Sequence, residues 1–577
     1  MSTFEETFEG DDDSYVSLTS QALALPNSSA PRRGSIILSN GPSLTYRTFP
    51  KRMSLDESDG DAMSQVNYGS ILDGADVRSF SSRRPSLTSI RGQSLRYAMS
   101  HGTFHESSTS YITEIKMLTK FSIPLVVTFL LQYSLTVSSV FSVGHLGEMP
   151  LAAVSLASMT ANVTAYSIIQ GIATCLDTLC PQAFGRNDHR MVGVHFLRCT
   201  TFLLLLYIPI FCLWFWGSKP LLLRIVPNPE LSGLASQYLR VLAFGLPGFI
   251  LFENCKHFLQ AQGIFHASTY VLLFCAPLNM LLNYLLVWDK KIGLGYIGAP
   301  VAVVFTNWLM AAMLIVYIAK VKGHECWCGF SREAFKNWKR MLDLAGPGVL
   351  MVEAEWLAFE IITFFASRFG PTVLASQTVV STTCVLMYQI PFAVSIASST
   401  RVAWFIGSGS KHAAILAVKV SMLVGLVLGL TNAAFLFNFR HTIASLFSSD
   451  TEVIELASKV LIVGSIYQVN DFISCIASGV LRGQGRQKIG GFLNLFSYYV
   501  VALPIAWYCG FHLGMELLGL WYGMVIALIL VSTSESFFIW LSDWDGIIQQ
   551  SIDDAIHDNC SLFGNPLSRI VSSISHA

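Results

Sequence analysis

The sequence predicts an all-α membrane protein: twelve transmembrane helices in two pseudo-symmetric six-helix lobes, preceded by a disordered N-terminal tail. Of its 577 residues, 52% are hydrophobic and only 13% are charged, whereas a soluble domain carries about 25% charged residues. From Phe121 onward, apolar segments of about 20 residues, long enough to span a bilayer, alternate with short polar joints. The two halves of this apolar part also resemble each other at a separation of about 222 residues.

The first 110 residues differ in composition from the rest. They are rich in Ser, Gly, Asp and Arg and have few long apolar runs, so they cannot bury enough surface to fold alone. We expect residues 1–110 to be a disordered cytoplasmic tail. Three basic signals in it are typical of protein-kinase sites, although a Ser-rich basic tail can produce such matches by chance. They predict phosphorylation, which adds nearly two negative charges at each site, on Ser35 in "RRGS", Ser54 in "KRMS" and Ser86 in "RRPS".

The twelve helices divide equally between two lobes. The N-terminal lobe, residues 111–325, contains the predicted spans 121–143, 151–174, 194–217, 233–256, 268–288 and 297–320. The C-terminal lobe, residues 326–545, contains 342–366, 373–400, 413–437, 454–478, 490–510 and 517–541. Residues 546–577 are predicted to be a polar cytoplasmic tail.

The polar joints predict the orientation of the chain. Lys and Arg concentrate in joints after even-numbered helices, among them Arg186, Lys322, Arg340, Lys411 and Arg486, and are fewer in the opposite joints. Because cytoplasmic loops carry the excess of Lys and Arg, both termini are predicted to be cytoplasmic.

An internal repeat relates the two halves. In order, "GEMPLAAVSL" (147–156) aligns with "GPTVLASQTV" (370–379), "DTLCPQAFG" (177–185) with "STRVAWFIG" (399–407), and "FLQAQG" (258–263) with "VLRGQG" (480–485). Six-helix repeats of this kind form two lobes related by an axis along the membrane normal, with a binding site between them. The repeat favours a transporter that works by alternating access, although a duplication can also be inherited without that use.

The segment "EAEWLAFEIITFF" (353–365) places three acids in an otherwise apolar helix: Glu353, Glu355 and Glu360. A carboxylate at bilayer depth costs about 2.5–3.5 kcal/mol, so an acid retained there indicates a function. A carboxylate away from water favours its neutral form, and an arriving cation favours the charged form. Such a group therefore binds a proton or a cation, but not both favourably, which is what an exchanger needs.

Four motifs resemble those of the multidrug and toxic compound extrusion (MATE) transporters, in particular the eukaryotic branch. They are "CLDTLCPQAFGRND" (175–188), "EWLAFE" (355–360), "SSTRVAWFIGSG" (398–409) and "VLRGQGRQKIGGFLNLFSYYVVALP" (480–504). The likeness covers about residues 110–545. It implies two six-helix lobes that export organic, usually cationic, molecules against a proton or sodium gradient.

The resemblance also carries over individual acids. Glu355 and Glu360 match the acidic pair of the seventh helix, and Asp471 in "YQVNDFISC" matches the acid of the tenth. The chain departs from the family elsewhere, because the eighth-helix glutamate of some animal members falls near Thr382 and the first-helix aspartate of prokaryotic relatives falls near Gln132. We therefore expect the proton- or substrate-binding site, formed by Glu355, Glu360 and Asp471, in the C-terminal lobe.

Other polar and aromatic residues are candidates for lining a cavity, although packing or lipid contact is the more common role of such residues. Flat cations bind aromatic faces, and the candidates are Gln132, Asn279, Asn283, Trp356, Tyr388 and Gln389. Two further acids have structural interpretations: Asp177 as a brace between helices and Glu253 as the partner of Lys256 or His257. No partner can be named for Glu535.

These features predict a secondary active antiporter that exports small organic molecules, cationic xenobiotics or metabolites, in exchange for protons. Sodium coupling is one alternative. A lipid-linked substrate flippase is another, but it favours an arginine-lined cavity, and only Arg401 and the Arg482 cluster lie near one. The histidines are dispersed, which argues against an intramembrane enzyme. The absence of GxGxxG and Walker-type loops argues against ATP-driven transport.

The expected cofactors and partners follow from this function. We expect no cofactor beyond H⁺ or Na⁺ as coupling ion, and no metal site. The expected partners are a small-molecule substrate, the lipid bilayer and protein kinases on the tail. Because the formal net charge is +0, there is no electrostatic case for nucleic acid. We predict a monomer in a vacuolar or plasma membrane.

Overall fold

The computed structural model describes residues 109–226, 228–289, 291 and 293–563, and in these residues every regular element is a helix. The predicted disorder of the N-terminal tail, and the phosphorylation sites Ser35, Ser54 and Ser86, lie outside the described residues. The lobe boundaries proposed from the sequence stay predictions.

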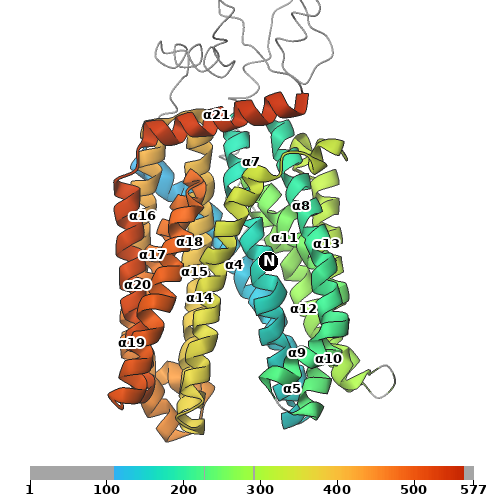
Figure 1. The fold of residues 1–577 in the computed structure, drawn as a ribbon, viewed down its shortest axis with the longest axis vertical. Coiled ribbons are helices and arrows are strands. Elements are labelled where there is room, and N and C mark those ends of the chain that lie inside the picture. Colours follow the sequence, from blue (N-terminus) through green and yellow to red (C-terminus); the bar gives the residue numbers. More distant parts are fainter. Residues whose placement is uncertain (1–108, 227, 290, 292, 564–577) are drawn as a thin grey trace, which may run out of the picture. The chain divides into compact units, whose positions relative to one another are not determined.

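The N-terminal lobe consists of six helical spans (Figure 1). The first is α4 (Tyr111–Gly144), the fifth is α12 (His266–Trp288) and the sixth is α13 (Gly298–Lys320), which follows η5 (Gly295–Ile297). The other three are interrupted by short irregular turns. The second span contains α5 (Glu148–Ala161), η2 (Asn162–Tyr166), α6 (Ser167–Ala173) and α7 (Leu176–Gly185). The third span contains α8 (His189–Cys212), η3 (Leu213–Gly217) and α9 (Ser218–Ile225). The fourth span contains α10 (Pro229–Leu242), η4 (Ala243–Gly245) and α11 (Leu246–Ala261).

The C-terminal lobe follows η6 (His324–Cys326) and η7 (Arg332–Phe335). Four of its spans are long single helices: α14 (Lys339–Ala366), α15 (Pro371–Ser408), α16 (Lys411–Phe447) and α17 (Thr451–Gln484). The fifth contains α18 (Gln487–Leu495), η8 (Phe496–Ala502), α19 (Leu503–Trp507) and η9 (Tyr508–His512), and the sixth is α20 (Glu516–Trp540). A final helix, α21 (Trp544–Phe563), crosses one end of the bundle (Figure 1).

The observed helical spans correspond one to one with the twelve predicted from the sequence. Within the described residues, eleven helical spans are long and apolar enough to cross a membrane. The twelfth, α14, is 28 residues long but carries the acids Glu353, Glu355 and Glu360. Each predicted span lies inside an observed one to within a residue. The chain is therefore an integral, multi-pass membrane protein.

Local sequence signals explain several helix ends. The side chains of Ser110 and Asp188 accept hydrogen bonds from the backbone of the first turns of α4 and α8, which satisfies donors that the helix leaves free. At their C-terminal ends, α15 and α17 stop at Gly409 and Gly485, with φ of 77° and 75°. Glycine adopts this left-handed conformation without a steric penalty.

The two motifs that the repeat relates meet at the interface between the lobes. A Cβ at Gly185 would lie 2.3 Å from the carbonyl oxygen of Trp404, and one at Gly407 would lie 2.2 Å from that of Gln182. Only glycine permits this approach, so each motif ends in a residue that lets the other lobe's backbone pack against it. Gln182 Nε2 also donates to the carbonyl of Gly483 at 3.1 Å.

The first helix of each lobe also contacts the opposite lobe. Helix α4 packs on α15 and α16, and α14 packs on α6. Arg401 of α15 forms a buried ion pair with Glu114 of α4 at 2.5 Å, and a Cβ at Gly171 of α6 would lie 2.5 Å from the Cα of Val349 in α14. These contacts follow the pseudo-symmetry that the repeat predicts.

Helix α21 is the main feature that the sequence did not predict, because residues 546–577 were expected to be only a polar tail. Its apolar side, Ile547, Ile548 and Ile552, packs with residues of α15 and α16. Its polar side bonds to the other lobe: Arg186 Nη1 donates to Ser551 Oγ at 3.0 Å, and Arg198 lies 3.7 Å from Asp558. Helix α21 therefore joins the two lobes at one end of the bundle.

We predict that Asp558→Asn lowers the thermal unfolding midpoint of the full chain in detergent. Asp558 is 4% exposed and faces both Arg198 and Arg340, each at 3.7 Å. Removing one partner of a buried ionic group costs on the order of 3 kcal/mol. The matched control is Asp553→Asn on the exposed side of the same helix. Equal midpoints for the two variants would contradict this role.

Asp554 makes the docking of α21 depend on pH. Burial raises the pKa of Asp554, and the Arg340 guanidinium at 3.4 Å only partly offsets this. Because the folded state holds the proton more tightly than the unfolded state, stability falls as pH rises from the ordinary pKa of Asp through the raised one. We expect Asp554→Asn to remove this part of the pH dependence, measured as the unfolding midpoint against pH. An unchanged slope would refute it.

Candidate functional site

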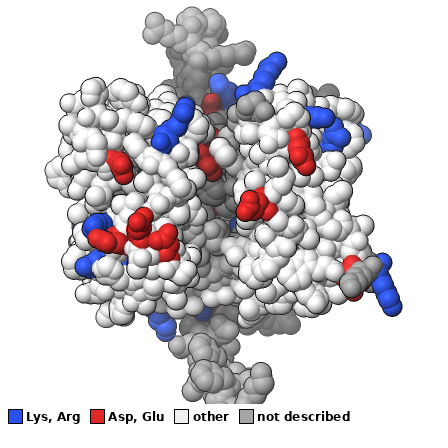
Figure 2. All heavy atoms as spheres, turned by 90° about the horizontal axis from the view of Figure 1, so that it is seen from below, with Lys and Arg blue, Asp and Glu red and all other residues white. Residues whose placement is uncertain are grey.

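The acids of α14 lie at different positions around the helix. Glu353 and Glu360 are half-buried, as is Glu355, whereas the neighbouring Trp356 is 42% exposed. Glu353 accepts a hydrogen bond from Ser167 of α6, in the opposite lobe. The face of the molecule opposite α21 is hollowed between its two halves, and Asp and Glu side chains lie on both sides of the hollow (Figure 2).

Glu355 lies close to Asp471 of α17. The two carboxyl groups interact electrostatically, and Tyr498 of η8 is within hydrogen-bonding reach of Glu355. Asp471 is 2% exposed, and Tyr498 is 1% exposed. The structure thus brings together two of the three acids that the sequence analysis selected. Glu360 is on the same helix, and no hydrogen bond or ion pair to it occurs among the described residues.

Glu535 of α20 joins this group, although sequence reasoning found no partner for it. Its side chain is fully buried, and both carboxylate oxygens are 2.9 Å from the hydroxyl of Ser478, which donates to them. It interacts electrostatically with Glu355. An acid with no partner in a long apolar span was the available signal, because a buried carboxylate in a membrane is by default a functional candidate. We define Glu355, Asp471 and Glu535 as the acid cluster.

The helix that carries Tyr498 is locally irregular. Residues Phe496–Ala502 form a π-helical turn, η8, in the middle of the eleventh span. Such turns occur frequently at functional sites because the extra residue redirects side chains. The corresponding span of the N-terminal lobe, α12, is one regular helix over His266–Trp288. The irregular turn therefore distinguishes the C-terminal lobe at the acid cluster.

Aromatic side chains lie along one side of the acid cluster. Tyr467, 2% exposed, packs edge-on against Trp521 and Phe359, with ring centroids 5.4 Å and 6.0 Å away. Tyr388 is half-buried and stacks on Phe392 at 5.6 Å. These contacts fix the rings and reduce the access of water to the acids.

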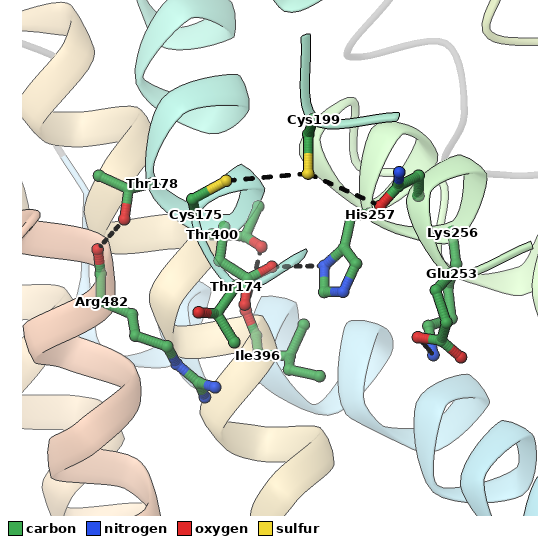
Figure 3. Close-up of polar contacts among 12 residues, drawn as sticks. Thr174, Cys175, Thr178, Cys199, Glu253, Lys256, His257, Ile396, Thr400 and Arg482 are labelled. Atoms are coloured by element: carbon green, nitrogen blue, oxygen red, sulfur yellow. Dashed lines mark hydrogen bonds and ion pairs between the residues drawn. The ribbon is translucent and has the colours of Figure 1, made fainter. Parts of the chain in front are cut away.

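The N-terminal lobe arranges its buried acids differently, since each has a basic partner. Lys256 Nζ is 2.6 Å from Glu253 Oε2, and His257 Nδ1 is 2.6 Å from Asp177 Oδ1. The ion pair predicted for Glu253 is thus confirmed. Figure 3 shows Glu253, Lys256 and His257 on one side of Thr174, and on the other side Arg482, whose backbone carbonyl accepts a hydrogen bond from Thr178. In this lobe, the protein itself supplies the basic partners of its acids.

Gln132 explains part of this difference. It follows Pro124 by eight residues, just as Glu355 follows Pro347 in the repeat-related helix. The N-terminal lobe therefore has an amide where the C-terminal lobe has an acid. Gln132 Nε2 donates to Glu253 Oε1 at 2.8 Å, so it serves as a partner for Glu253.

The other predicted cavity residues fall into two groups. Trp356, Tyr388 and Gln389 are exposed or half-buried, and Gln389 donates to the carbonyl of Val385 in its own helix. Asn279 and Asn283 are fully buried instead, and Asn279 donates to Thr306 while Asn283 donates to Asn279. In this conformation the two asparagines are held by each other and by α13, and a role in lining a cavity stays a prediction.

The chain matches the MatE family model twice, at residues 124–285 and 347–508. The chain belongs to the MATE family. The two matches also confirm the internal repeat, because they begin at the related prolines Pro124 and Pro347. MATE proteins are transporters, which agrees with the twelve spans found here.

Similar proteins occur across eukaryotes. An uncharacterized transporter of Saccharomyces cerevisiae is 45% identical over 442 residues, which is 77% of this chain and 63% of the relative. The chain thus matches less than two thirds of that relative's length. The human multidrug and toxin extrusion protein 1 is 31% identical over 75% of each chain. The crystal structure of the eukaryotic MATE transporter AtDTX14 superposes with a TM-score of 0.72 and 27% identity, covering 76% of this chain and 98% of that one.

We predict that the buried Glu253–Lys256 pair is structural and that its two members depend on each other. Lys256→Met and Glu253→Gln should each lower the free energy of unfolding by about 3–5 kcal/mol, because each leaves one buried charge without its partner. The double variant should recover most of the loss, since it leaves neither charge. Thermal unfolding of the purified chain measures this, and strictly additive losses would rule it out.

Proposed function

We propose that this MATE transporter is an antiporter that exports small organic cations in exchange for protons, and that Glu355 and Asp471 bind either the proton or the cation. One observation carries the proposal. The acid cluster of the C-terminal lobe, Glu355, Asp471 and Glu535, has no ion pair among the described residues, whereas the buried acids Glu253 and Asp177 of the N-terminal lobe have Lys256 and His257 as basic partners.

A carboxylate in a low-dielectric environment needs either a cation beside it or a proton on it. Glu355 and Asp471 have no fixed cation, so each must take its counter-charge from solution. A proton and an organic cation are then alternatives at one place. Exchange follows from this competition, because arrival of the cation favours the charged carboxyl and releases the proton.

Glu360 supports this site in the proposal, and Trp356 and Tyr388 offer aromatic faces to a flat cation. The hollow face in Figure 2 is the route by which substrate leaves and protons arrive. The acidic side chains around it favour cations near its mouth. A monomer suffices for this mechanism, because each lobe pair contains a complete site.

The orientation of the chain is also a proposal. The Lys- and Arg-rich joints gather at the end covered by α21, where Arg186, Lys411 and Arg486 bond to Ser551, Asp545 and Ser542. Since such joints face the cytoplasm, α21 and both termini are cytoplasmic and the hollow face is extracytoplasmic. A vacuolar or plasma membrane supplies a proton gradient of the required sign.

The flippase alternative would use arginines that are free to bind phosphate. Arg401 is instead paired with Glu114, and Arg482 donates to Ser395 at 2.8 Å. Sodium coupling is distinguished from proton coupling by experiment, because a carboxylate cluster suits both ions.

We predict that proteoliposomes containing the full chain accumulate ethidium when their interior is acidic. Glu355→Gln and Asp471→Asn should reduce uptake to the level of empty liposomes, because an amide neither binds the proton nor attracts the cation. The exposed Glu452→Gln is the control and should transport normally.

A sodium gradient without a pH gradient should not drive this uptake. Uptake driven by sodium alone would replace the proton with sodium as the coupling ion. Normal proton-driven uptake in both acid variants would refute the location of the site.

A further inference from the structure

Glu535 is the buried acid that the proposed exchange does not use. It comes from α20, and the other two members of the acid cluster come from α14 and α17. Its side chain has no exposed surface, and no ion pair to it occurs among the described residues. A buried charge without a partner is too costly to persist, so this group needs an explanation.

The surroundings of Glu535 admit a carboxyl group in either charge state. Ser478 donates to both oxygens at 2.9 Å, which supports the ionised form. The side chain of Arg482, one turn further along α17, interacts electrostatically with it, yet Arg482 donates its own hydrogen bond to Ser395. Glu535 therefore has a hydroxyl partner and a distant cation, which is too little to fix it permanently as an ion.

The packing around Glu535 leaves room for its carboxyl group. A Cβ at Gly490 of α18 would lie 3.1 Å from Glu535 Oε1 and 2.7 Å from Met351 Cε. A side chain at position 490 would crowd the carboxyl group and Met351, so Gly490 leaves more room for Glu535. Tyr498, which lies in the irregular turn η8, interacts electrostatically with Glu535, Asp471 and Glu355.

We infer that Glu535 is a third exchangeable proton site of the transporter, buried behind Glu355, which gains and loses its proton during transport. The inference rests on the proposed proton exchange and deepens it. The charge of Glu535 acts on Glu355: when Glu535 is ionised, Glu355 holds its own proton more firmly. When Glu535 is neutral, Glu355 ionises more readily and accepts a cation.

The groups that face Glu535 fit this role. They are Glu355 on α14, Tyr498 on η8, and Ser478 and Arg482 on α17. Ser478 and Arg482 are separated by one helical turn, so both point to the same side of α17. Protonation of Glu535 adds one hydrogen to the carboxylate. Ser478, which donates to both oxygens of the ionised group, then contacts a neutral acid.

The direct test is infrared difference spectroscopy of the purified full chain during a pH titration, because the C=O stretch of a protonated carboxyl is seen without any substrate. We expect one such component that disappears as pH rises and is absent from Glu535→Gln. This variant is nearly isosteric and can still accept the hydrogen bond of Ser478, so it should fold. Glu452→Gln, on an exposed turn, should retain every buried component.

A second variant tests the same assignment by changing Ser478, the hydrogen-bond donor to Glu535. Ser478→Ala keeps the carboxyl group but removes its hydrogen-bond donor, so the component should remain and disappear only at higher pH. A component that stays protonated throughout, or one that Glu535→Gln does not remove, would overturn the inference.

The pH dependence of ethidium uptake tests whether Glu535 acts in transport. In proteoliposomes, Glu535→Gln should still take up ethidium, with the pH midpoint of uptake shifted lower by about one unit, because a neighbouring charge is lost. A purely structural role would lower the uptake at every pH without moving the midpoint, and that result would also overturn the inference. Failure of the wild-type chain to exchange ethidium for protons contradicts the proposed function, whereas the infrared result alone decides the protonation of Glu535.

Discussion

The arrangement of this transporter depends on one constraint: a carboxylate away from water must have a cation or a proton. The two lobes satisfy the constraint in different ways. In the N-terminal lobe, Lys256 and His257 are built-in partners for Glu253 and Asp177. In the C-terminal lobe, the acid cluster has no such partner among the described residues, so its neutrality depends on what solution supplies. A duplicated fold thus contains one lobe whose buried acids have built-in basic partners and one whose acid cluster, in the proposed mechanism, exchanges its counter-charge with solution.

The second requirement of alternating access is an interface that can close tightly and open again. At the end covered by α21, the lobes meet through Gly185 and Gly407, where backbone packs on backbone. The contacts there are hydrogen bonds from side chains to carbonyls, such as Gln182 to Gly483, together with the ion pairs of α21. Polar contacts of this kind can be exchanged for water when the lobes separate. An apolar cluster that includes Leu125 of α4 and Ile396 of α15 also lies between the lobes.

Much of the fold could be predicted from the sequence because hydropathy and repetition are local and strong signals. The twelve spans follow from apolar length, and even α14, whose acids weaken its apolar character, is recognisable from its relation to α4. Helix α21 could not be predicted in the same way. Its three isoleucines face the protein and not the lipid, and a short amphipathic segment in a polar tail gives no indication of which surface it covers.

The candidate site, like the fold, could be predicted from the sequence only in part. Glu355 was predicted as an acid out of place in an apolar helix and Asp471 from the family resemblance, and the structure brings the two close together. Glu535 was visible as an acid but lacked a partner, because Ser478 lies on another helix and a serine in a membrane span gives no signal. Asn279 and Asn283 were selected from the family resemblance, and their mutual hydrogen bond could not be predicted from the sequence.

The most direct test of the central claim is to count protons released when a cation binds. Purified transporter in weakly buffered detergent solution would be mixed with ethidium while a pH indicator is recorded. Competition at the acid cluster predicts release of about one proton or more for each ethidium bound, with the release lost in Glu355→Gln. Ethidium binding without proton release by the wild-type chain would contradict the claim.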